Sequence, residues 1–297
     1  METFIMMKRW ARARLGSRVM GIGLVALATG LLGSPQALAQ VKDTKHNLGS
    51  TNSIAGANKY TSTNGDSTQV CVFCHTPHGS NTTAQLPLWN RALGTATYTT
   101  YASLGTTTLE GKTAAVGSVS LACLSCHDGT QAINVMNNTP GSGNAALTGS
   151  WSAGTGSLDI DGKFKAGVIA NIGGDLQNDH PIGIQYAGGP KTGSVPAAGQ
   201  PYTNTMFNDE AFADASSAEL NSNPVWWVDT STGSPGSREK TDMQLYARTD
   251  ASSGGSTLTG VQPFVECASC HDPHTNKALF LRIENTGSAV CLACHIK

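Results

Sequence analysis

The stretch that decides the fold reads CVFCHTPH at residues 71–78, and it recurs as CASCHDPH at residues 267–274. Two shorter versions, CLSCH at 123–127 and CLACH at 291–295, complete a set of four Cys-x-x-Cys-His motifs. One such pentapeptide could arise by chance, but these four use every cysteine of the chain. The eight cysteines are Cys71, Cys74, Cys123, Cys126, Cys267, Cys270, Cys291 and Cys294.

Cys-x-x-Cys-His is the attachment signature of c-type haem. The two thiols form thioethers with the porphyrin vinyl groups, and the histidine that follows becomes the proximal iron ligand. A zinc site would not require a histidine after every second cysteine, a redox dithiol favours a βαβ context, and a disulfide scaffold predicts irregular spacing. The motifs therefore predict four covalently bound haem c groups with four proximal ligands, which are His75, His127, His271 and His295.

The histidines outside the motifs match the number of irons that need a second axial ligand. The simplest interpretation is bis-histidine ligation at every haem, with a distal ligand from each of the four remaining histidines. The alternative is that some of them are solvated and that a methionine serves instead, because thioethers are also axial ligands. The remaining histidines are His46, His78, His180 and His274, and the methionines after residue 39 are Met136, Met206 and Met243.

Spacing refines the roles of His78 and His274, which each follow a proximal histidine by three positions. Such a residue is tethered on the same side of its own ring, so it reaches a neighbouring haem more easily than the opposite face of its own. Pro77 and Pro273 stiffen the two connections by fixing φ. The alternative is an exposed histidine in a polar turn.

The N-terminal 39 residues have the pattern of a secretory signal peptide. A basic segment precedes an apolar stretch at residues 19–32 and a small-x-small cleavage site, Ala37-Leu38-Ala39. An uncleaved anchor is the alternative, but the apolar stretch is short and Gly-rich for a span, and we expect no transmembrane segment in the mature chain. The protein is thus expected to be exported, to the cell exterior or outer surface, and otherwise to the periplasm.

Composition limits the fold and the partners. Removing residues 1–39 takes away five basic residues and one acidic residue, which leaves 14 basic and 19 acidic residues and a net charge of −5. Without a basic patch, nucleic acid is not an expected partner. Charged residues make up 13% of the chain, about half the usual share. We predict a mostly irregular, loop-rich fold with short α-helices and little β-structure, whose core is the haem chain, and a largely disordered chain without haem.

The motifs follow one another as two series. His46, CVFCHTPH and CLSCH form the first, and His180, CASCHDPH and CLACH form the second, with LPLWNR and DMQLYAR as their aromatic segments. We predict two two-haem modules, residues 40–150 and 151–297, joined near the Gly/Ser-rich stretch 139–157, the second with inserted loops at 191–239. Short helices are expected at 130–136 and 209–220, and haem-packing aromatics rather than a strand at 225–228.

Several segments together resemble a known class of proteins. The segments are His-Asn-Leu at 46–48, CVFCHTPH followed by LPLWNR, GSVSLACLSCHDGTQA, and CASCHDPH…FLR…CLACHIK. They resemble the doubled-CxxCH multihaem cytochromes of metal-reducing bacteria. They are most similar to the tetrahaem subunits of extracellular cytochrome filaments. The resemblance implies a loop-rich fold around a continuous haem chain, bis-histidine irons and head-to-tail polymerisation. It also makes His46, near the predicted mature N-terminus, the candidate for ligating a haem of the next subunit.

Filled axial positions favour electron transfer over catalysis, because six-coordinate haem offers substrate no place to bind. We therefore expect an electron-transfer protein rather than an enzyme. Its expected partners are other redox proteins, copies of itself and an extracellular metal oxide as terminal acceptor. A soluble periplasmic shuttle is the main alternative. A multihaem reductase is the second, although it would need an open iron and no unmatched motif is present.

Overall fold

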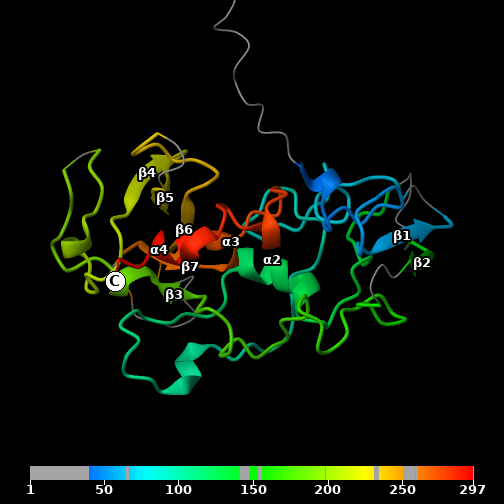
Figure 1. Ribbon diagram of the computed structural model, residues 1–297, viewed down its shortest axis with the longest axis horizontal. Coiled ribbons are helices and arrows are strands. Elements are labelled where there is room, and N and C mark those ends of the chain that lie inside the picture. The colour runs from blue at the N-terminus through cyan, green and yellow to red at the C-terminus, as the bar shows by residue number, and fades with distance from the viewer. Residues whose placement is uncertain are drawn as a thin grey trace, which may run out of the picture. The chain divides into compact units, whose positions relative to one another are not determined.

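The computed structural model describes residues 40–64, 67–140, 147–152, 156–197, 199–230, 234–249, 258 and 260–296. The chain divides into two units, residues 1–38 and 39–297. The predicted signal peptide lies outside the described residues, and so do parts of the stretch 139–157. Figure 1 shows the elements of the second unit in chain order.

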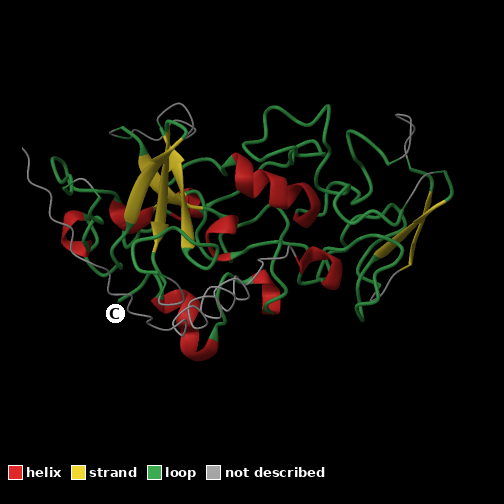
Figure 2. Cartoon of the chain, turned by 90° about the horizontal axis from the view of Figure 1, so that it is seen from above, coloured by secondary structure: helices red, strands yellow, loops and turns green. Residues whose placement is uncertain are grey.

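The larger sheet has five antiparallel strands in the order β3-β7-β6-β5-β4, drawn as yellow arrows in Figure 2. A two-residue loop joins β4 to β5, and its residues Asn221 and Ser222 have φ values of 51° and 61°. Positive φ at both central positions is the geometry that matches the twist of a hairpin. The strands are β3 (Ile184–Gln185), β4 (Ser216–Leu220), β5 (Asn223–Val228), β6 (Met243–Arg248) and β7 (Gln262–Val265).

The core of this sheet explains why its residues form strands. β5 reads NPVWWV, and the consecutive side chains of Trp226 and Trp227 are both buried although they point to opposite faces of the strand. Aromatic and β-branched residues suit such a doubly covered strand. One face contributes to a cluster that consists of Tyr186, Ala187, Phe207, Ala215, Trp226, Val228, Met243, Leu245 and Ile283.

A second sheet pairs β1 (Lys59–Ser62) with β2 (Gly149–Ser152). The Tyr60 hydroxyl donates a hydrogen bond to the Leu147 carbonyl at 2.9 Å, and both residues pack with Val72 and Phe73 in a smaller apolar cluster. A Cβ atom on Gly149 would collide with the Thr61 carbonyl. Glycine is therefore required where the two strands approach.

The predicted fold class, mostly irregular with short α-helices and little β-structure, is wrong. The described residues contain two antiparallel sheets with seven strands, and three short α-helices. The helix expected at 209–220 is absent, and the second part of this segment is strand β4. The segment 225–228, expected not to be a strand, is part of β5. The signal was weak because Gly, Ser, Thr and Asn fill the connections, and because these strands are specified by distant partners rather than by alternation.

Each α-helix of the described chain contains or overlaps a Cys-x-x-Cys-His motif. They are α2 (Ser118–His127), α3 (Cys267–Cys270) and α4 (Ala289–Leu292). The helix expected at 130–136 is absent, and turns occupy this segment. No helix among the described residues has the length and apolar character that a membrane crossing requires. Single 3-10 turns occur at Gln40–Asp43, Tyr101–Leu104, Tyr186–Gly188, Asn204–Met206, Ala278–Phe280 and Thr286–Ser288.

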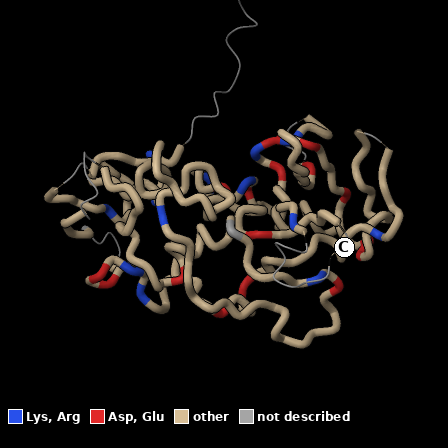
Figure 3. The backbone as a smooth tube through the Cα atoms, turned by 180° about the vertical axis from the view of Figure 1, so that it is seen from behind, with Lys and Arg blue, Asp and Glu red and all other residues tan. Residues whose placement is uncertain are grey.

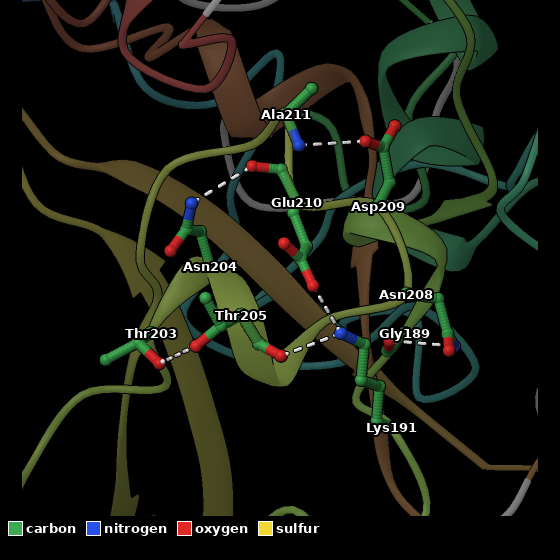
Figure 4. A network of polar contacts seen from close by, with 9 residues as sticks. All are labelled: Gly189, Lys191, Thr203, Asn204, Thr205, Asn208, Asp209, Glu210 and Ala211. Atoms are coloured by element: carbon green, nitrogen blue, oxygen red, sulfur yellow. Dashed lines mark hydrogen bonds and ion pairs between the residues drawn. The ribbon is translucent and has the colours of Figure 1, made fainter.

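The insertion that the sequence could not place, residues 191–239, begins with a polar network (Figure 4). The Lys191 ammonium donates to the Glu210 carboxylate at 2.6 Å and to the Thr205 carbonyl at 2.9 Å. The Asn204 amide donates to the Glu210 carbonyl at 3.0 Å. These contacts hold the turn that precedes Ala211.

Candidate functional site

Each motif folds as one helical turn. In the first, third and fourth motifs the histidine N–H donates to the carbonyl of the first cysteine, and the second motif lies within α2. Residues three and four apart share a helix face, so both thiols and the imidazole project together. The N–H···O distances are 2.8 Å for His75 to Cys71, 3.2 Å for His271 to Cys267 and 2.9 Å for His295 to Cys291.

The proximal imidazoles are oriented by backbone carbonyls. A carbonyl only accepts, so Nδ1 must be the protonated nitrogen and Nε2 keeps its lone pair for a metal. This is the outer-shell arrangement usual for ligating histidines. The contacts run from His75 Nδ1 to Pro87 at 2.9 Å, from His127 Nδ1 to Ala170 at 2.7 Å and from His271 Nδ1 to Leu279 at 2.8 Å.

The carbonyl contacts of His75 and His271 belong to a repeated backbone pattern. After the first motif, the Thr76 N–H donates to the Leu88 carbonyl and the Asn90 N–H donates to the Cys74 carbonyl. After the third motif, the Asp272 N–H donates to the Phe280 carbonyl and the Arg282 N–H donates to the Cys270 carbonyl. Leu88 and Phe280 both have positive φ, 58° and 57°. PLWN at 87–90 therefore corresponds to LFLR at 279–282, and not to DMQLYAR, which forms strand β6.

Two distal candidates lie opposite proximal histidines. An imidazole nitrogen lies about 2.0–2.1 Å from a first-row metal and its ring centre about 1.1 Å further, so two trans imidazoles have centres roughly 6 Å apart. The ring centres of His75 and His274 are 6.1 Å apart with an interplanar angle of 18°. Those of His46 and His127 are 6.2 Å apart at 63°. Each separation would suit two imidazoles that hold one haem iron.

His46 lies against residues of its own chain, and the expectation that it ligates a haem of a neighbouring subunit stays a prediction. Its ring stacks on Phe280 at 4.0 Å and faces His127 within the same chain. Burial, together with the charge of His127, lowers the pKa of His46 to about 4. The imidazole is therefore neutral and able to act as a ligand at physiological pH.

His274 is fixed by the acidic residue of its own motif. The Asp272 carboxylate lies 3.3 Å from His274 Nδ1 and accepts the His274 N–H at 2.9 Å. Burial opposes ionisation of Asp272, but these hydrogen bonds outweigh it and lower its pKa to about 2. A carboxylate on Nδ1 leaves Nε2 for the metal and raises the basicity of the ligand.

The two other distal candidates, His78 and His180, are exposed. Among the described residues neither ring contacts a proximal histidine. Met243, one of the alternative ligands, is fully buried in the core of the large sheet. The roles of His78 and His180 therefore stay predictions.

The insertion supports the fourth motif. The Phe212 ring lies 4.5 Å from the His295 ring. Ala213 N–H donates to the Cys294 carbonyl at 2.8 Å, and Ile296 N–H donates to the Ala211 carbonyl at 3.0 Å. The sequence contained no motif that would identify this role.

The cysteines connect the motifs in chain order. Cys74 packs against the apolar cluster that contains Ala122 of α2, and the backbone N–H of Cys267 donates to the Ser120 hydroxyl on α2 at 3.0 Å. Cys270 and Cys294 pack against the same core cluster of the large sheet. Consecutive motifs are therefore neighbours in space, first to second, second to third and third to fourth.

Two buried arginines near the motifs were not identified from the sequence. Arg91 is 0% exposed, and its five hydrogen bonds go to one hydroxyl and four backbone carbonyls. Arg248 pairs with Glu266 at 2.9 Å, and both side chains are buried. Because charged residues are few, each arginine was a possible signal in the sequence. Figure 3 shows how sparsely charged residues occur along the backbone.

The chain was compared with known proteins. Residues 262–297 match the family model described as the doubled CXXCH motif. No curated protein matches the chain. The matched segment contains the third and fourth motifs, and it indicates covalent haem c binding of the kind found in c-type cytochromes.

Proposed function

We propose that this protein is a tetrahaem electron-transfer cytochrome that relays electrons along four bis-histidine haems. The observation that carries the proposal is the spatial succession of the motifs, in which each motif packs beside the next one along the chain. Four groups attached in this order would form one continuous series. Bound haem supplies reversible one-electron chemistry at iron.

The residues of the chain hold and orient the ligands and exclude substrate. The backbone carbonyls of Pro87, Ala170 and Leu279 fix the proximal rings. His274 and His46 face two of these rings at ligand spacing. Imidazole on both sides would leave no open position at the irons held by these two pairs, which supports electron transfer over a reductase.

Haem content and ligation test the proposal directly. Intact mass should give four haems per chain, and reduced protein should show no spectral change with carbon monoxide. Electron paramagnetic resonance should distinguish the nearly parallel His75–His274 pair from the crossed His46–His127 pair. A stable high-spin haem in fully loaded protein would contradict the proposal.

Ligand substitutions assign the pairs. His274→Met should raise the reduction potential of one haem, because Met/His ligation gives a higher potential than bis-histidine ligation. His46→Ala should open the haem attached at the second motif to carbon monoxide while all four haems stay attached. Four unchanged potentials in His274→Met would remove His274 from the ligand set.

The cellular role that we propose is extracellular electron transfer by a self-associating chain, with a periplasmic shuttle as the alternative. The exposed His78 and His180 support self-association, since an exposed imidazole can reach a haem of a second copy. An open, head-to-tail contact of this kind forms filaments. Electron microscopy of secreted material tests it: regular haem-containing fibres support the proposal, and monodisperse monomers favour the shuttle.

A further inference from the structure

A buried polar cluster joins the second motif to the third. The Ser120 hydroxyl on α2 donates to Glu266 Oε2 at 2.6 Å and accepts from the Cys267 N–H at 3.0 Å. Arg248 on β6 donates to Glu266 Oε1 at 2.9 Å and to the Ala115 carbonyl at 2.7 Å. The cluster thus connects α2, strand β6 and the start of α3.

Glu266 is the centre of this cluster. It is 1% exposed and lies directly before Cys267. Its N–H donates to Ser269 Oγ at 3.0 Å, and its carboxylate also accepts from Gly117 N–H at 3.4 Å. A buried carboxylate persists only where charge and hydrogen bonds compensate it, so these partners must stay in place.

The cluster lies where the two motifs approach each other. Ser120 is one helical turn before Cys123 on α2, and its hydroxyl accepts the backbone N–H of Cys267 at 3.0 Å. Any shift of α2 against α3 would break the bonds of Ser120 to Glu266 and to Cys267 together. Because the cysteines become the attachment points, this contact determines how two attached groups are placed relative to each other.

We infer that Ser120, Glu266 and Arg248 form a positioning cluster that holds the second and third haem-attachment segments in one fixed arrangement. The inference rests on the proposed function and deepens it, since it names the residues that join the two halves of the relay. None of the three residues contacts a proposed iron ligand in the bonds described above. They act through the cysteines of the two motifs.

The test uses Glu266→Gln and Ser120→Ala in the full haem-loaded protein. Glu266→Gln keeps the shape but removes the charge that Arg248 pairs with. Ser120→Ala keeps the ion pair and removes only the link to α2. Glu210→Gln is the matched control, since Glu210 pairs with Lys191 at the surface (Figure 4).

Two readouts report on placement rather than on stability: the bisignate circular dichroism of the Soret band, which depends on the relative orientation of neighbouring haems, and the set of reduction potentials. We expect both variants to retain their haems by intact mass, to lose part of the Soret couplet and to show shifted potentials. Glu210→Gln should match the unmodified protein. If Glu266→Gln does not accumulate, Ser120→Ala decides.

An unchanged couplet and unchanged potentials, with only a lower melting temperature, would overturn the inference and leave the cluster a packing element. Peptide mapping first establishes that the second and third motifs are loaded in the unmodified protein. If the unmodified protein carries fewer than four haems but these two motifs are loaded, the tetrahaem proposal is contradicted and this test can still be made. If it carries four haems and the variants keep its Soret couplet and potentials, only this inference is contradicted.

Discussion

The segments that begin with the first and third motifs, residues 71–91 and 267–282, share a backbone pattern but differ in their surroundings. In both, the proximal histidine contacts a carbonyl ahead of a residue with positive φ. In both, a side chain donates a hydrogen bond to the carbonyl of the residue that follows the first cysteine. Asn90 donates to the Val72 carbonyl, and Arg282 donates to the Ala268 carbonyl. Residues 71–91 lie among loops and small apolar clusters, whereas residues 267–282 continue from a five-stranded sheet.

This difference separates two tasks of the chain. The shared hydrogen bonds orient a ligand and are achieved with unlike side chains, because most of them use the backbone. The surrounding packing stabilises each half by its own means. The first half relies on buried polar contacts such as those of Arg91, and the second on the apolar core of the sheet.

The largest effect is expected from removing the attachment sites. With all eight cysteines replaced by alanine, we expect residues 40–140 to lose amide protection, while strands β5, β6 and β7 retain it, because they enclose a protein-only core. Hydrogen exchange read by mass spectrometry measures both regions. Equal loss of protection in both halves would contradict the comparison.

The next largest effect is expected at Arg91. Arg91→Met leaves carbonyls of Ile133, Val135, Ser125 and Ala132 without their donor, and buried unsatisfied groups cost about 1–3 kcal/mol each. We expect a loss of about 3–5 kcal/mol in unfolding free energy, against about 1–2 kcal/mol for Arg282→Met, since Arg282 is less deeply buried. Chemical denaturation measures both, and similar losses would argue against the contrast.

A smaller effect separates the two CxxCHxPH motifs. Asp272 places a carboxylate on His274, whereas the equivalent Thr76 bonds the His78 carbonyl. Asp272→Asn removes the charge that makes His274 a stronger donor, so we expect one reduction potential to rise. Redox titration measures the shift. Thr76→Val is the control and should leave that potential unchanged.

The smallest effect is expected in the polar network of Figure 4. The side chains of Lys191 and Glu210 are 38% and 56% exposed, and exposed ion pairs contribute about 0–1 kcal/mol. Glu210→Gln should therefore change the unfolding free energy by less than about 1 kcal/mol, the low end of single substitutions. A larger loss would mean that the support of the fourth motif depends on this ion pair.

Several site features were predictable from the sequence because they are local. The spacing in Cys71-x-x-Cys74-His75 dictates one helical turn with three groups on one face. The prediction that a histidine three positions after a proximal ligand serves another haem stays open to the substitutions above, and the His274 ring lies 6.1 Å from that of His75. The correspondence of PLWN with LFLR was also available, but the unequal distances from their histidines concealed it.

The sequence by itself determined that four Cys-x-x-Cys-His motifs and four further histidines are present, and it predicted haem attachment, because covalent attachment requires fixed residues at short spacing. Only the tertiary structure decided that His46 faces His127, that Ser120 meets Glu266, and that the residues of β3 to β7 form one sheet. Those contacts join residues far apart in the chain. Their energy comes from burial and pairing with distant partners, which no local pattern encodes.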